Sequence, residues 1–96
     1  MTYAFVQDVP IDLRLYERIK ADLGGAPPAG LIVHVVEQTD AGLRYLDVWE
    51  SEEACDRFTE ERLHPVVGRV LAEAGFRPPD GEPPRRRIDV REVWKP

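Results

Sequence analysis

The chain has 96 residues, of which 43% are hydrophobic and 32% are charged, and its net charge is −5. This length fits one domain over residues 1–96 with a core of modest size. The acidic balance argues against nucleic acid and anionic membranes as partners, because both attract basic surfaces. No apolar run approaches the ~20 residues of a membrane-spanning helix, so no membrane association is expected.

The cysteine content and the N-terminal residues indicate the cellular compartment in which the protein is expected to work. The chain has one cysteine, Cys55, so an internal disulfide bond is excluded. The first residues lack the basic and apolar stretches of a secretory signal. We therefore expect a cytoplasmic protein that works in a reducing environment.

The first half of the chain predicts a strand, a helix and a β-hairpin. Asp12 can cap the helix, and Lys20 is the one polar side chain on its apolar face. A loop rich in Pro and Gly follows, and a turn ending at Gly42 separates two β-rich segments, which indicates an antiparallel hairpin. The predicted elements are residues 3–9, 13–23, 31–36 and 43–49.

The second half predicts a long helix and a final strand over residues 87–94. Ser51 is the candidate N-cap, and Thr59 and Arg62 are the polar exceptions in the apolar stripe that follows. Pro65 lacks a backbone donor, so we expect a kink or break near residues 63–64. A basic run at residues 85–87 is interpreted as a solvated loop edge.

The element order predicts the fold. Strand, helix, strand, strand, helix, strand with right-handed crossovers gives the ferredoxin-like β-α-β-β-α-β arrangement of the α+β class. Both helices then lie on one face of a four-stranded antiparallel sheet.

Strand parity divides the sheet residues into two sets, because alternate side chains point to opposite faces. One set is aliphatic and is assigned to the helix side. The second set mixes aromatic and polar side chains and is assigned to the opposite face, where a second copy of the chain would cover it and close a pocket. The second set is Tyr3, Phe5, Gln7, Ile32, His34, Val36, Tyr45, Asp47, Trp49, Asp89, Arg91 and Val93.

The chain resembles the dimeric α/β-barrel superfamily at residues 30–35 and 47–54, at Phe58 and at residues 61–65. Within it, the chain is similar to small bacterial proteins grouped with the antibiotic-biosynthesis monooxygenases. The resemblance implies a ferredoxin-like homodimer. The superfamily includes cofactor-independent monooxygenases, polyketide cyclases, haem-degrading enzymes and proteins with no known reaction.

His34 and Asp47 are the candidate catalytic residues. His34 is the only polar side chain in an apolar run, and histidine is the residue type whose charge changes near neutral pH, so it can act as an acid or base toward a ligand. A satisfied buried histidine at the dimer seam is the structural alternative. Asp47 shares the predicted face and requires a partner there, for which His34 and Arg91 are the candidates.

The remaining candidates would bind substrate. Aromatic side chains on this face can stack a flat polycyclic molecule, although they can equally be core. The predicted substrate-binding residues are Tyr3, Phe5, Gln7, Tyr45, Trp49 and Arg91.

No cofactor and no metal are predicted. His34 and His64 lack metal-ligand spacing. The haem-degrading relatives use an asparagine where this chain has Gln7 and a tryptophan where it has Phe58, and this difference argues against haem.

The expected function is therefore small-molecule binding by a homodimer, with a small hydrophobic or aromatic metabolite as ligand. The leading reaction is cofactor-independent monooxygenation of an aromatic or polyketide-like compound. A polyketide cyclase or isomerase and a non-catalytic ligand-binding or scaffold protein are the alternatives.

Overall fold

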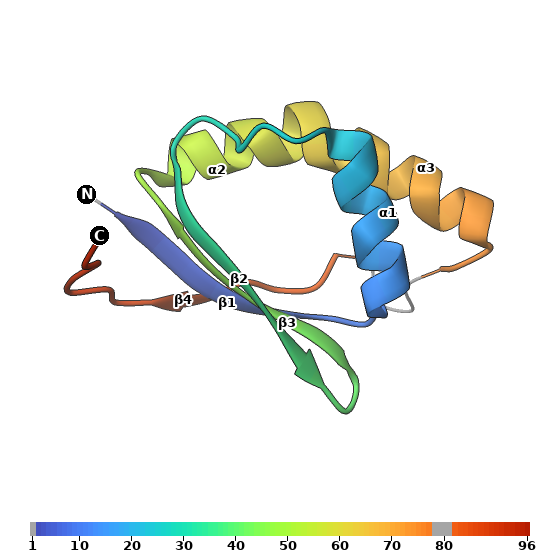
Figure 1. The fold of residues 1–96 in the computed structure, drawn as a ribbon, viewed down its shortest axis with the longest axis horizontal. Helices are drawn as coiled ribbons and strands as arrows, with labels where there is room; N and C mark the ends of the chain where they lie inside the picture. Colours follow the sequence, from blue (N-terminus) through green and yellow to red (C-terminus); the bar gives the residue numbers. More distant parts are fainter. Residues whose placement is uncertain (1, 78–81) are drawn as a thin grey trace.

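The elements follow the predicted ferredoxin-like order along residues 2–77 and 82–96, which are the residues that the computed structural model describes. The helices all cover one face of a four-stranded antiparallel sheet, as Figure 1 shows, and the α+β prediction is confirmed. The elements are β1 (Tyr3–Val9), α1 (Leu13–Leu23), β2 (Leu31–Thr39), β3 (Gly42–Trp49), α2 (Glu52–Phe58), the π-helical turn η1 (Thr59–Leu63), α3 (His64–Ala74) and β4 (Arg86–Ile88).

The N-termini of α1 and α2 are each capped by a polar side chain. Asp12 accepts a hydrogen bond from the backbone N–H of Leu15 at 2.9 Å, which begins α1. Ser51 accepts one from the N–H of Ala54 at 3.1 Å, which begins α2. Each side chain satisfies a donor that the first helical turn leaves unpaired.

The strand order is β2-β3-β1-β4, and each neighbouring pair is antiparallel. A register shift at Ile32 places Leu31 opposite Trp49 and His34 opposite Asp47. The bulge therefore turns Leu31 and His34 to the same face of the sheet, although three positions separate them. That face is the one that the helices cover.

The aromatic and polar residues of the sheet face the helices, so the predicted assignment of the two faces is wrong. Tyr3, Phe5 and Trp49 form one buried cluster with Cys55 of α2. Tyr45 packs with residues of α1 and α3 in a second cluster. Polar groups on this face need partners inside the molecule, which come from neighbouring strands, from the segment before β4 and, for His34, from Tyr16 of α1.

The aliphatic set lies on the outer face, opposite the helices. Its cross-strand rows are Ala4–Val48–Val33 and Val6–Leu46–Val35, with Ile88 of β4 beside Ala4. Val35 is 46% exposed. These side chains carry no polar group, so they require no hydrogen-bond partner from the helices.

The second helical stretch runs from Glu52 to Ala74 without a break. The irregularity predicted near residues 63–64 is the π-helical turn η1, and Pro65 lies in the first turn of α3. Because proline has no N–H, it cannot continue the α-helical bonding pattern, and the wider turn precedes it.

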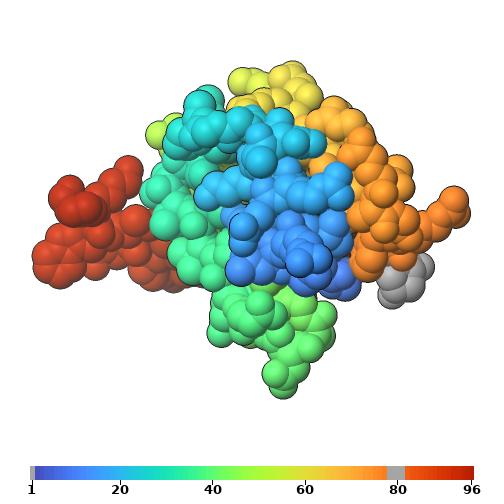
Figure 2. All heavy atoms as spheres, turned by 45° about the vertical axis from the view of Figure 1, so that its right-hand side comes forward, coloured from blue at the N-terminus to red at the C-terminus, as the bar shows by residue number. Residues whose placement is uncertain are grey.

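The last strand is shorter than the predicted residues 87–94. It spans Arg86–Ile88 and pairs with β1, where Ile88 lies opposite Ala4. Since β1 begins at Tyr3, the antiparallel register leaves little backbone for later residues to pair with. Residues 89–96 project from the body as a tail (Figure 2), and Trp94 on it is 92% exposed.

The β2–β3 turn depends on Gly42. Its φ of +149° is unfavourable for other residues, and a Cβ atom would lie 2.4 Å from the carbonyl oxygen of Val9. We expect Gly42→Ala to lower the free energy of unfolding by about 2–3 kcal/mol, because backbone atoms must move. Urea denaturation measures this change. Gly25→Ala, at a glycine with open space around it, is the control, and equal losses in both variants would contradict the expectation.

Candidate functional site

A cavity of about 760 Å³ lies between the inner face of the sheet and the helices. Most of its lining is apolar, including Ile19, Phe58, Val67 and Leu71. Polar side chains are a minority of the lining, and they come from the strands, the helices and the segment before β4. An apolar cavity with a small number of placed polar groups is typical of a small-molecule site.

His34 and Asp47 meet in this cavity on the neighbouring strands β2 and β3. Their Cα atoms are paired in register, and His34 Nδ1 lies 2.5 Å from Asp47 Oδ1. Asp47 is 8% exposed. Its second oxygen, Oδ2, accepts a hydrogen bond from Trp49 Nε1 at 3.1 Å. The carboxylate is therefore held on both oxygens, and it orients the imidazole.

Tyr16 completes the arrangement from the helix side. Its hydroxyl lies 2.9 Å from His34 Nε2, and both residues line the cavity. The sequence reasoning placed Tyr16 on the apolar face of α1 without assigning it a role. A hydroxyl on a face that packs against the sheet needs a polar partner, and this requirement is the signal that could have found it.

The hydrogen bonds indicate the proton positions. With Asp47 as acceptor, the proton of a neutral His34 lies on Nδ1, and Nε2 accepts from the Tyr16 hydroxyl. Burial, and secondly the negative charge of Asp47, raise the pKa of Tyr16. Tyr16 is thus held as a neutral phenol that donates. Nε2 is the imidazole atom that can take a proton from a bound molecule.

Four of the six predicted substrate-binding residues line the cavity, and two do not. Phe5, Gln7, Tyr45 and Trp49 line the cavity with the candidate catalytic pair. The ring of Tyr45 lies edge-on to His34, with centroids 5.2 Å apart. Gln7 donates to the backbone carbonyl of Pro83 at 2.8 Å, which fixes its amide at the cavity wall.

Tyr3 and Arg91 lie elsewhere. Tyr3 is buried in the core and lines a second, polar pocket of about 450 Å³ beside α2 and η1. Arg91 lies on the exposed tail, where it pairs with Asp89 at 3.0 Å, and it lines neither of these two pockets. The predicted contact between Arg91 and Asp47 is absent, because β4 ends before residue 91.

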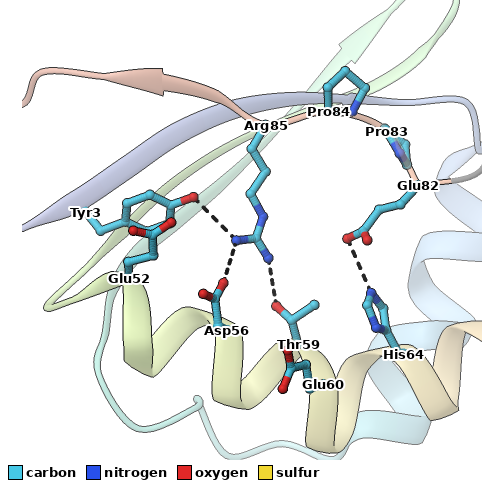
Figure 3. Close-up of a pocket in the computed structure, with 10 residues that line it drawn as sticks. All are labelled: Tyr3, Glu52, Asp56, Thr59, Glu60, His64, Glu82, Pro83, Pro84 and Arg85. Atoms are coloured by element: carbon cyan, nitrogen blue, oxygen red, sulfur yellow. Dashed lines mark hydrogen bonds and ion pairs between the residues drawn. The ribbon is translucent and has the colours of Figure 1, made fainter.

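Arg85 is a structural residue that the sequence reasoning misjudged as a solvated loop edge. Its guanidinium donates to Asp56 and Thr59, each at 3.0 Å, and approaches the Tyr3 hydroxyl at 3.4 Å (Figure 3). Its side chain is only 21% exposed. Arg85 therefore ties the segment before β4 to α2 and η1, and separates the polar pocket from the cavity, both of which it lines.

Three further features concern other kinds of site. Within residues 2–77 and 82–96, no group of three His, Cys, Asp or Glu side chains is placed to hold a metal ion. None of the helices in those ranges has the length and hydropathy needed to cross a bilayer. Burial raises the pKa of the Cys55 thiol, which disfavours its thiolate.

Comparison with known proteins supports the fold. No protein-family model matches the chain, and no curated protein matches it. A solved structure from Chloroflexus aurantiacus J-10-fl matches with a TM-score of 0.63 and 14% sequence identity, over 99% of this chain and 98% of the other. That protein is provisionally assigned as an antibiotic biosynthesis monooxygenase. At this identity, the similarity establishes the shared ferredoxin-like fold.

Because of Tyr45, the free energy of unfolding should decrease as the pH rises through the alkaline range. Burial raises its pKa most, followed by the charges of Tyr16 and Asp47, so the folded state favours the neutral phenol. This contribution is fully present below about pH 10, where the unfolded phenol is also neutral, and is lost as pH rises further. Between pH 9 and pH 11, we expect the free energy of unfolding of Tyr45→Phe to fall by about 1 kcal/mol less than that of the wild type. Urea denaturation at both pH values tests this, and parallel losses would contradict it.

Proposed function

We propose that the protein binds a flat aromatic or polyketide-like molecule in the cavity and that His34 removes a proton from it. The reaction proposed is cofactor-independent monooxygenation, in the cytosol. The observation that carries the proposal is the hydrogen-bonded series Tyr16–His34–Asp47 facing an apolar cavity. The solved structure of similar fold has a provisional assignment of the same kind and adds support.

The chemistry requires a base that is oriented and shielded from water. Asp47 holds the Nδ1 side of His34, and it stabilises the imidazolium that forms when Nε2 takes a proton. Tyr16 occupies the hydrogen-bonding position at Nε2. A substrate oxygen or acidic carbon would take this position, and the Tyr16 hydroxyl would then donate to the substrate.

The oxygenation step balances without a cofactor. His34 takes a proton from an acidic CH₂ group that is conjugated through aromatic rings to a ketone, and the carbanion gives electrons to O₂. A carbon–oxygen bond forms, and the imidazolium returns its proton to the peroxide. The O–O bond then breaks with loss of water and leaves a ketone. The CH₂ carbon is oxidised, one oxygen atom enters the product, and the other is reduced to water.

An anthrone is a suitable test compound, because its central CH₂ is acidic and its oxidised product is a coloured anthraquinone. We expect the wild type to consume one O₂ per quinone formed, measured with an oxygen electrode and by absorbance. His34→Gln should lower kcat by about 100-fold or more, since it removes the base. A smaller loss is expected for Tyr16→Phe, which keeps the base.

Full activity of His34→Gln would overturn the proposed role of His34. Conversion of a polyketide-like substrate without O₂ uptake would favour a cyclase or isomerase, which begins with the same proton removal. Binding of the anthrone without turnover would favour a non-catalytic ligand-binding protein.

Gly68 offers a test of where the ligand binds. It lines the cavity on the same face of α3 as His64 and Leu71, and a Cβ atom there would meet nothing within 4 Å. We expect Gly68→Phe to fold but to lose ligand binding, because its ring fills part of the cavity. Gly68→Ala, the control, should bind normally and gain about 1 kcal/mol of stability from helix propensity. Calorimetric titration of the anthrone measures the affinities, and unchanged binding by Gly68→Phe would place the ligand elsewhere.

The homodimer is part of the proposal, with the outer sheet face as its interface. Val6, Val35 and Leu46 lie in an apolar row there. The next row, Asp8–Arg44–Glu37, is an ion-paired edge, with Arg44 2.7 Å from Asp8 and 3.6 Å from Glu37. An apolar centre with a polar rim is the usual anatomy of a protein interface. Covering it with a second sheet would remove apolar area from water.

Light scattering after size exclusion tests the dimer. We expect a mass of twice 11.0 kDa for the wild type and dissociation in Val35→Glu, which puts a charge on the apolar face. Leu13→Glu is a matched control, because Leu13 on α1 is exposed to a similar extent, 47% against 46%. A monomeric wild type at micromolar concentration, or equal dissociation of both variants, would contradict the interface.

A further inference from the structure

Of the residues that the structure describes, five charged side chains line the cavity, apart from its histidines: Lys20, Asp47, Arg62, Glu82 and Arg85. Its carboxylates both have partners. Asp47 is bound by His34 and Trp49, and Glu82 lies 3.3 Å from His64. Arg85 is neutralised by Asp56.

Lys20 and Arg62 differ from Arg85. Among residues 2–77 and 82–96, neither forms an ion pair with a carboxylate, and both are exposed at the cavity opening. Asp22 of α1 pairs with Arg69, and Glu73 of α3 pairs with Arg18. Glu17, three positions before Lys20, and Glu61, next to Arg62 in sequence, are exposed and do not line the cavity. Lys20 and Arg62 are thus cations of the cavity lining that form no ion pair with a described carboxylate.

Arg62 is held in place without being neutralised. Its Nη2 donates to the backbone carbonyl of Leu23 at 2.7 Å, and its guanidinium stacks on Phe58 with 5.3 Å to the ring centroid. One of its five N–H groups is used in this bond, so most of the fork remains available. Lys20 precedes Leu23 by three positions and thus lies on the same side of α1.

The spacing along α1 sets the size of the ligand. Tyr16, Lys20 and Leu23 all line the cavity. With a rise of 1.5 Å per residue, Lys20 lies about 6 Å and Leu23 about 10 Å along the helix from Tyr16. The distance from the proton-accepting end to the cations is thus about the length of two or three fused aromatic rings.

We propose that Lys20 and Arg62 bind a carboxylate at the cavity opening, and that the ligand is a flat aromatic acid whose reactive hydroxyl or acidic carbon lies at His34. This inference rests on the proposed function and specifies its substrate class. The planar guanidinium fork suits a carboxylate, with Lys20 as a second point charge. The apolar lining between the two ends suits the rings.

A set of matched naphthalenes tests the proposal by calorimetric titration. The probe is 6-hydroxy-2-naphthoate, whose hydroxyl and carboxylate lie at opposite ends of the rings. We expect it to bind about fivefold to tenfold more tightly than the neutral 6-hydroxy-2-naphthamide. It should also bind more tightly than 1-hydroxy-2-naphthoate, whose adjacent groups cannot reach both ends of the cavity.

The variants are Lys20→Met and Arg62→Gln, the second of which keeps a donor for the Leu23 carbonyl. Each should lower the affinity for 6-hydroxy-2-naphthoate by about threefold or more and leave that for the amide unchanged. Arg62→Lys should restore part of the loss. Arg14→Met is the control, because Arg14 is an exposed cation on the same helix that does not line the cavity.

Equal affinity for the acid and the amide would overturn the carboxylate site, and so would an equal effect of Arg14→Met. Tighter, Lys20-dependent binding of 6-hydroxy-2-naphthyl phosphate would overturn it in favour of a phosphate ligand. In each of these outcomes the proposed function stands, since the oxidation of neutral anthrone by His34 is measured separately. Failure of all these probes and of anthrone to bind would overturn both proposals.

Discussion

Asp47 is 8% exposed, and its two carboxylate oxygens accept hydrogen bonds from His34 and Trp49. A buried carboxylate is costly unless it is bonded on both oxygens, so its partners must be present whenever the fold is. His34 comes from the neighbouring strand, and its free nitrogen then requires Tyr16 from α1. One buried charge thereby fixes the register of β2 on β3 and the position of α1 above the sheet.

The two faces of the sheet follow from this requirement. His34, Asp47 and Trp49 point to the helices, and they bond to one another and to Tyr16 of α1. The outer face carries two aliphatic rows and the ion-paired row Asp8–Arg44–Glu37. The pocket is consequently formed within one chain, between sheet and helices. On the outer face Val35 is exposed, while Ala4 and Val48 are already buried in the single chain. In our proposal, binding and assembly use opposite faces of the same sheet.

The positions of the charged groups along the cavity bear on the ligand that it can bind. The buried end holds one carboxylate, which is fully bonded, and the opening holds Lys20 and Arg62 without carboxylate partners in the described part of the chain. An interior that is apolar between a base and a pair of cations defines both a length and a polarity for its ligand. These properties belong to the arrangement of three elements, α1, β2 and η1, and not to any one segment.

The sequence by itself predicted most of the elements and their order, and it offered His34 and Arg91 as candidate partners of Asp47, because periodicity, caps and strand parity are local properties. Tertiary structure decided that His34 is that partner. It decided, too, which face the helices cover, where Tyr16 contacts His34 and Phe58 contacts Trp49. It also decided the end of β4, since a strand extends only as far as β1 offers backbone to pair with. The structural role of Arg85 could not be predicted from the sequence either, because its partners Asp56 and Thr59 lie 29 and 26 positions away.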